Sequence, residues 1–255
     1  MKSNHKLILI LLIISVISIA IGLTYYNLEN QKIDRRVIAA REYYATYNEL
    51  ASSYDFVTLL QLLAKTEHVY QQVRHYQNSY ELSVLDNNRS AILLTIALFR
   101  DSVKTMIVPD SFQNYSFVDL LNLANYYSTK AIEGYQGWKM KFQQLDDSQL
   151  ELEVRKDFFD GFPESSESSK EKALFKRIKE IETARDEVDR RLSVAFTNRG
   201  VIARHLEDYQ EAARCYKIAL DLWSENLDAE NNLNILLNQP IRRKGVIEKL
   251  FPPEK

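Results

Sequence analysis

One stretch decides the fold: Phe196-Thr197-Asn198-Arg199-Gly200, continuing through Leu206-Glu207-Asp208 to Ile218-Ala219-Leu220. It predicts a helix, a tight corner at 206–208 and a second helix. Small residues stand where the two helices must touch, and bulky residues fill the space between them. The small residues are Gly200, Ala203, Ala212 and Ala219, and the bulky ones are Phe196, Tyr209, Tyr216 and Leu220. We expect Gly200 and Ala212 to face each other across the pair.

At this point the sequence resembles a tetratricopeptide repeat, a helix–turn–helix unit of about 34 residues with small and aromatic positions in this order. The repeat-packing positions would be Phe196, Gly200, Ala203, Ala212, Tyr216 and Ala219. Three positions depart from the pattern: Arg199 where Leu is usual, Glu207 where Gly is frequent and Ser224 where Pro is frequent. The resemblance covers about Leu192 to Leu237, less than a fifth of the chain.

A further segment, Asp228 to Leu237, matches the start of a next repeat until Pro240 ends it, and it predicts a capping helix. In this family the first helices of the repeats line a concave groove that holds a partner peptide or helix. Carried over by position, that face would hold Thr197, Asn198, Val201, Arg204, His205, Asp228, Asn231, Asn232 and Ile235. An Asn side chain can hydrogen-bond an extended backbone through both its donor and its acceptor, and Arg204 could pair with a carboxylate. The alternative is that these are ordinary solvated polar positions.

The N-terminal region carries an apolar run from Leu7 to Leu23, broken only by Ser15 and Ser18. About 17 to 20 apolar residues suffice for a helix across a bilayer, so the run predicts an uncleaved membrane anchor. The competing interpretation is a cleaved signal peptide, although the run is long for one. The short basic N-terminus favours export of the body. The basic residues just past the span, Lys32, Arg35, Arg36 and Arg41, argue for the opposite orientation.

Helical spacing continues through the middle of the chain. It predicts a helix from Gln31 to about Ser53, a second capped by Asp55 and a third capped near Asp86-Asn87-Asn88 and stopped by Pro109. A fourth helix should begin at a capping box formed by Ser116 and Asp119. Within it, Asn122 to Tyr127 resembles the first helix of a degenerate repeat, whose expected second helix would be interrupted by Gly134 and Gly137.

The segment from Asp146 to Glu167 is acidic and closes in Gly161-Phe162-Pro163 and a serine-rich run, which predicts a solvated linker, or alternatively a partner-docking tract. From Lys170 a long helix resumes with one apolar seam on alternating four- and three-residue steps. The seam residues are Leu174, Ile178, Ile181, Val188, Leu192, Ala195 and Ile202, with Arg185 and Arg199 in the same register. We expect it to pack on the chain's own upstream helices, the alternative being self-association.

Composition and motifs narrow the function. The net charge of −2 offers no basic footprint for nucleic acid, and the single cysteine, Cys215, excludes an intrachain disulfide. We predict a packed thiol there, since no His or Lys lies one turn away. No catalytic or phosphate-binding motif is present, so we predict neither an enzyme nor a cofactor. His68 and His75 lack a third suitably spaced ligand for a metal ion, so we expect them to be surface polar residues.

The sequence therefore predicts an all-α protein: an N-terminal transmembrane helix followed by a helical-hairpin bundle that ends in a short tetratricopeptide-like unit. The expected division is 1–26 anchor, 27–145 helical region, 146–169 acidic linker, 170–239 long helix with repeat and capping helix, and 240–255 basic tail. This architecture loosely resembles small bacterial envelope proteins found with MoxR-type ATPases and von Willebrand-type domain proteins, or with export chaperones. That resemblance implies a single-pass inner-membrane scaffold for other proteins, with an exported body. The alternative is a self-associating coiled-coil membrane protein.

Overall fold

The computed structural model describes residues 34–163 and 166–243, and within them the protein is all-α, with eight α-helices and no strand. None of these helices is long and apolar enough to span a bilayer. The predicted anchor, Leu7–Leu23, and its signal-peptide alternative lie outside the described residues. Residues 244–255, which make up most of the predicted tail, also lie outside the described residues.

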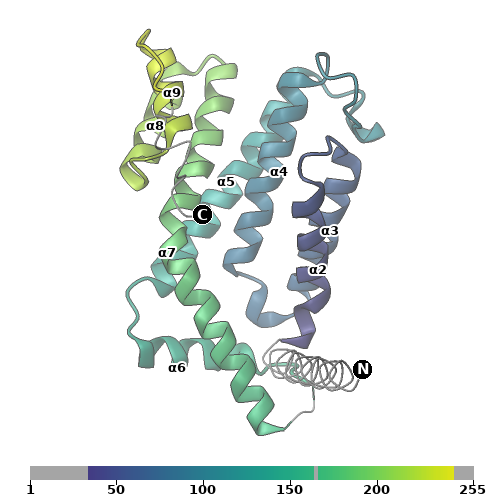
Figure 1. Ribbon diagram of the computed structural model, residues 1–255, viewed down its shortest axis with the longest axis vertical. Helices are drawn as coiled ribbons and strands as arrows, with labels where there is room; N and C mark the ends of the chain where they lie inside the picture. Colours follow the sequence, from purple (N-terminus) through teal and green to yellow (C-terminus); the bar gives the residue numbers. More distant parts are fainter. Residues whose placement is uncertain (1–33, 164–165, 244–255) are drawn as a thin grey trace, which may run out of the picture.

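Six of the helices form three hairpins that lie side by side along the molecule (Figure 1). The first hairpin pairs α2 (Ile38–Leu50) with α3 (Phe56–Gln71), and the second pairs α4 (Tyr80–Phe99) with α5 (Phe117–Phe142). The third pairs the end of α7 (Glu167–His205) with α8 (Tyr209–Leu222), and α9 (Leu227–Leu236) packs against that hairpin. The remaining helix, α6 (Asp147–Phe158), packs across the lower part of α7. Short 3₁₀ turns occur at Arg35–Val37, Arg74–Tyr76 and Asp110–Phe112.

Two of the predicted helix starts are confirmed by their cap geometry. The Asp55 carboxylate accepts a hydrogen bond from the Thr58 backbone N–H at 3.1 Å, which starts α3. Ser116 and Asp119 form the predicted capping box of α5, each side chain accepting from the other residue's backbone N–H. Side-chain caps of this kind satisfy backbone donors that have no partner within the helix.

The predicted cap at Asp86-Asn87-Asn88 is wrong, because these residues lie in the middle of α4. Asp86 is buried and pairs with Arg89 at 3.1 Å and with Lys130 at 3.2 Å. Those partners satisfy its side chain inside the bundle, so it is not needed at a helix end. The helix instead begins at Tyr80 and ends at Phe99.

Gly134 and Gly137 do not interrupt α5, which runs through both. Gly134 lies where α4 comes closest, and a Cβ at this position would collide with the Ser83 side chain. Close packing of two helices therefore accounts for one of these glycines. The repeat-like segment 122–127 lies in α5, whose hairpin partner, α4, precedes it in sequence. The repeat pattern expects the partner helix to follow residues 122–127, whereas the partner, α4, precedes them.

The acidic stretch after residue 145 was predicted to be a linker, but its first half forms α6. Asp146 caps this helix in a second capping box, with Gln149. Leu150, Val154 and Phe158 recur every four residues, and all three are fully buried. One buried stripe suffices to fold an otherwise charged helix onto the core.

The long helix α7 confirms the prediction of an uninterrupted helix that ends in the first half of the C-terminal hairpin. Most of its seam is buried within the chain, at Leu174, Ile181, Val188, Leu192, Ala195 and Ile202. The predicted corner is also confirmed. Glu207 adopts a left-handed φ of 64°, while the Asp208 N–H donates to the Ala203 carbonyl at 2.9 Å. This is the hydrogen-bond pattern of a Schellman turn, in which Gly is the usual left-handed residue.

In the C-terminal hairpin, the side chain nearest to Gly200 is that of Tyr216. A Cβ built on Gly200 would lie 2.5 Å from Cε1 of the Tyr216 ring, and its three nearest atoms all belong to that ring. Tyr216 and Ala212 are both fully buried. Gly200 therefore makes room for an aromatic ring, because the bulky residue of α8 sits directly over the glycine.

Candidate functional site

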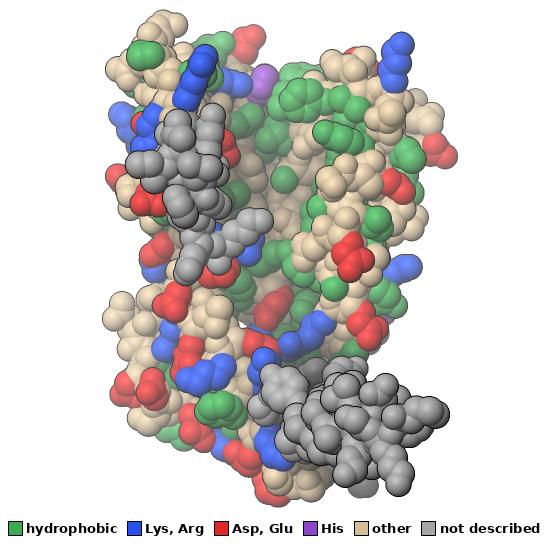
Figure 2. Space-filling model, viewed as in Figure 1, with side chains coloured by type: hydrophobic (Ala, Val, Ile, Leu, Met, Phe, Trp, Pro, Cys, Tyr) green, Lys and Arg blue, Asp and Glu red, His purple; other side chains and the backbone are tan. Residues whose placement is uncertain are grey.

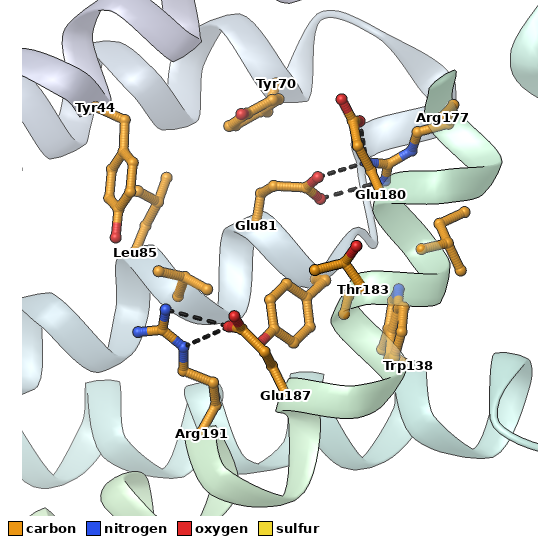
Figure 3. Close-up of a pocket in the computed structure, with 14 residues that line it drawn as sticks. Tyr44, Tyr70, Glu81, Leu85, Trp138, Arg177, Glu180, Thr183, Glu187 and Arg191 are labelled. Carbon is orange, nitrogen blue, oxygen red and sulfur yellow. Dashed lines mark hydrogen bonds and ion pairs between the residues drawn. The ribbon is translucent and has the colours of Figure 1, made fainter. Parts of the chain in front are cut away.

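The face between α2, α4 and α7 is hollowed (Figure 2), and a cavity of about 250 Å³ lies between these helices (Figure 3). The cavity is lined mainly by α4 and α7, with Tyr44 contributed by α2, Tyr70 by α3 and Trp138 by α5. Apolar side chains of α4 and α7 form part of its wall, namely Val84, Leu85, Ile181 and Ala184. We call this hollow the α2–α4–α7 groove.

An ion-pair cluster centred on Arg177 closes one end of the cavity (Figure 3). The side chain of Arg177 is only 4 % exposed. Its guanidinium pairs with Glu81 of α4, with Nη1–Oε1 and Nη2–Oε2 distances of 2.5 and 3.3 Å, and with Glu180 at 3.3 Å. Arg41 of α2 pairs with Glu180 at 2.7 Å, so the cluster ties three helices together. Burial would raise the pKa of Glu81, but the charge and hydrogen bonds of Arg177 outweigh it and lower that pKa to about 2.

A second, looser pair lies further along α7. Arg191 donates to Glu187 through Nε and Nη2, both at 3.4 Å. Burial would lower the pKa of Arg191, but the neighbouring Tyr80, Tyr135 and Glu187 outweigh this effect and raise it. Arg191 is thus a permanently charged group within the groove, with long contacts to its carboxylate partner.

Side-chain amides link the helices that border the groove. The Asn88 amide of α4 donates to the Tyr44 hydroxyl of α2 at 3.1 Å. The Asn198 amide of α7 donates to the Asn87 Oδ1 atom of α4 at 3.1 Å. Asn88, Tyr44 and Asn198 are only partly buried. Partly exposed amide groups therefore lie on the helices that border the cavity, and one of them bonds the Tyr44 hydroxyl of its lining.

The residues predicted to line a groove fall into separate places. Thr197 is buried, and its hydroxyl donates to the Ser193 carbonyl at 2.8 Å and accepts from Asn226 at 3.0 Å. Asn226 caps α9, so Thr197 holds that helix in position. Of the predicted set, Asn198 bonds from α7 to α4, two of the helices that border the α2–α4–α7 groove.

Other members of that set meet between α7 and α9. Arg204 Nη1 donates to the Asn232 Oδ1 atom at 3.3 Å, and the Asn232 amide donates to the Asp228 carbonyl at 2.8 Å. His205 lies edge-on to Phe117 of α5, with ring centroids 6.1 Å apart. Val201 is half-buried against the core, and Ile235 is exposed. The remaining member, Asn231, hydrogen-bonds the backbone of Arg242.

The two histidines do not share a helix face, because α3 ends at Gln71. His68 is exposed on α3, whereas His75 is turned inward between α6 and α7. Its Nδ1 atom lies 2.6 Å from an Asp157 carboxylate oxygen, and its Nε2 atom accepts from the Arg177 Nε at 3.1 Å. In the part of the chain that the structure describes, no three His, Cys, Asp or Glu side chains are placed to hold a metal ion.

His75 should make stability depend on pH. Burial, followed by the positive charge of Arg177, lowers its pKa below the ordinary value of about 6.5. The folded protein therefore binds the proton less tightly than the unfolded chain, so stability is full above pH ~6.5 and falls as the pH drops below it. Each tenfold difference in proton affinity corresponds to about 1.4 kcal/mol. We expect His75→Asn to reduce the loss of unfolding free energy between pH 7.5 and 5.5, measured by urea denaturation. His68→Asn, as the exposed control, should leave that loss unchanged, and an equal loss in both variants would contradict the assignment.

Cys215 is a packed thiol, as predicted. It is fully buried, and its Sγ atom lies 3.4 Å from a Glu211 carboxylate oxygen. Burial, reinforced by the Glu211 charge, raises the pKa of the thiol to about 12. The thiol is therefore protonated at neutral pH and has little nucleophilic character.

Comparison with known protein families, curated proteins and solved structures finds no match to this chain. The functional conclusion therefore depends on the arrangement of the residues themselves.

Sequence reasoning missed the main residues of the groove. Arg177 and Glu81 lie 96 positions apart, and no local motif joins them. One signal was present. Arg177 follows Leu174 by three residues and precedes Ile181 by four, so it shares a helix face with these two seam residues, and a charge on an apolar face predicts a buried partner.

Proposed function

We propose that this protein is a scaffold that holds a segment of a partner protein in the α2–α4–α7 groove. We further propose that its three hairpins and α9 form a short solenoid resembling tetratricopeptide repeats. The stacking of the hairpins supports this, because α2, α4 and α7, the first helix of each, all border the groove. Repeats of this kind bind partners on the concave surface formed by successive units.

The chemistry of the groove suits a peptide segment. Its aromatic and aliphatic walls fit an apolar side chain. The partly exposed amides of Asn88 and Asn198, on the helices that border the groove, can pair with backbone N–H and C=O groups. Arg191 can add a contact to a carboxylate of the partner, since its bonds to Glu187 are long.

We also propose that Leu7–Leu23 anchors the scaffold in the inner membrane with the body exported. The first described residues support a short tether. Arg36 donates to the carbonyls of Phe158 and Asp160 at 2.6 Å each and lies over the Phe162 ring at 4.7 Å. Twelve residues, 24–35, separate Arg36 from the apolar run, and such a chain reaches at most about 43 Å. The groove would then work close to the bilayer.

The alternative of a self-associating coiled coil is less well supported. It depended on the apolar seam of α7, and most of that seam is buried within the chain. Packing within one chain therefore accounts for the apolar seam of α7 without self-association.

Site-specific photo-crosslinking in membranes tests the proposal. A photoreactive amino acid at Thr183, which lines the groove and is exposed, should give a discrete adduct with another protein. The same group at Lys217, exposed on α8 away from the groove lining, should not. The absence of an adduct from Thr183, or equal adducts from both positions, would exclude the groove as the binding surface.

A further inference from the structure

The chain after α9 folds back along that helix. Asn238 adopts a left-handed φ of 55°, and the Gln239 N–H donates to the Asn234 carbonyl at 2.7 Å. This Schellman turn reverses the chain direction, so that Arg242 returns to the level of Asn231, eleven residues earlier. Residues 239–243 have no regular secondary structure and are exposed.

Two neighbouring side chains of α9 hold this segment, and we call Glu230 and Asn231 the α9 clasp. The Asn231 amide donates to the Arg242 carbonyl at 3.0 Å, and its Oδ1 atom accepts from the Arg242 N–H at 2.7 Å. Both backbone groups of one residue are therefore paired with one side chain. The Glu230 carboxylate pairs with the Arg242 guanidinium, with an Nε–Oε2 distance of 3.2 Å.

These contacts have the chemistry of peptide recognition. An amide that pairs with both the N–H and the C=O of one residue selects an extended backbone and is indifferent to the side chain. A carboxylate beside it adds a preference for a basic side chain. The clasp therefore suits an extended segment with an arginine at one position.

The clasp holds the chain's own tail through polar contacts. Asn231 and Glu230 both reach Arg242 through hydrogen bonds or an ion pair, while the neighbouring Pro240 is exposed and Ile241 is 52 % exposed. Exposed polar contacts are individually weak, and here they are formed because the tail is tethered a few residues away. A free segment of the same chemistry can replace a tail held in this manner.

We propose that the α9 clasp is a docking site for an extended, arginine-containing segment of a partner protein, and that the chain's own Arg242 occupies it in the free protein. This site shares no residue with the α2–α4–α7 groove. A test of the α9 clasp can therefore fail or succeed independently of the crosslinking experiment at Thr183. The tail acts as a competitor that a partner must displace.

Peptide binding to the full chain in detergent micelles tests this inference. The probe is a fluorescent synthetic peptide with the sequence of residues 239–246, and binding is measured by anisotropy. The parent should bind the probe weakly, because the tethered tail competes at roughly millimolar effective concentration. The variant Arg242→Glu with Arg243→Glu, in which Glu230 repels the tail, should bind it at least about ten times more tightly.

Adding Asn231→Ala to that variant should abolish the gain, and a probe with Glu at both arginine positions should not bind. Circular dichroism melting of each variant verifies that it is folded. Equal affinity of the parent and the tail variant would overturn the inference, and so would full binding by the variant that lacks Asn231.

Discussion

Replacing Arg177 with methionine is expected to lower the free energy of unfolding by about 3 kcal/mol, which is within the range for breaking one side of a buried ion pair. The change leaves the Glu81 carboxylate without its main partner and removes the donor to His75. It also removes the guanidinium that stacks 4.4 Å from the centre of the Tyr76 ring. Methionine fills a similar volume, so the loss reports the charge and hydrogen bonds. Urea denaturation at pH 7 measures it.

Acid unfolding provides a second readout of the same substitution. The folded pKa of Glu81, about 2, lies below the unfolded value of about 4.3. Its contribution to stability is therefore full above pH ~4.3 and is lost as the pH falls towards 2. Arg177→Met should remove this contribution, so the stability of the variant should fall less than that of the parent between pH 4.5 and 2.5.

A matched control separates the buried cluster from ion pairing in general. Arg155 also pairs with a glutamate on another helix, Glu171, at 2.7 and 2.8 Å, but both side chains are more than a third exposed. Arg155→Met should therefore cost no more than about 1 kcal/mol. If the two methionine variants are equally stable, the Arg177 cluster is not a structural centre of the groove.

The helices that sequence could predict are those whose signals are local. Asp55, the Ser116–Asp119 capping box and the corner at 206–208 each depend on residues within four positions of one another, and each is confirmed. The failures arose where distant contacts override the local pattern. Asp86 is of a residue type that favours helix caps. However, ion pairs with Lys130 of α5 and with Arg89, one turn away, allow it to be buried in the middle of α4.

The acidic segment shows a second limit of local reasoning. Its charge predicted a linker, because its many acidic side chains outweigh the few apolar ones in any composition average. Leu150, Val154 and Phe158 occupy one face, however, and burial of that face on the core decides the structure. The four-residue spacing of the apolar residues predicted this helix better than the overall composition did.

The candidate groove was harder to predict than the fold, because its residues come from five helices. Tyr44, Glu81 and Arg177 have no sequence relation that a spacing rule detects. The resemblance to a repeat pointed to α7 and α9, where Asn198 and Asn231 do bond across elements. It gave no indication that the earlier hairpins would form the other wall.

The Gly200–Tyr216 contact carries the second large effect. Gly200→Ala should lower the free energy of unfolding by about 1–3 kcal/mol, as expected when a group is forced into a packed contact. The added Cβ would lie 2.5 Å from the Tyr216 ring, which is fully buried. This cost exceeds the gain of up to about 1 kcal/mol that alanine brings to a helix interior. Thermal denaturation followed by circular dichroism measures the difference.

Gly137→Ala is the matched control, because it makes the same change in another long helix, α5. Apart from the local backbone of α5 and the two neighbouring residues, no atom lies within 4 Å of a Cβ built on Gly137, so the helix propensity of alanine acts alone. This variant should gain about 0.5–1 kcal/mol, opposite in sign to the effect at Gly200. The same Gly200→Ala change should cost less free energy of unfolding when it is made in a Tyr216→Leu background. The smaller leucine side chain leaves room for the added methyl group. Strict additivity of the two changes would mean that the tyrosine ring is not what excludes a side chain at position 200.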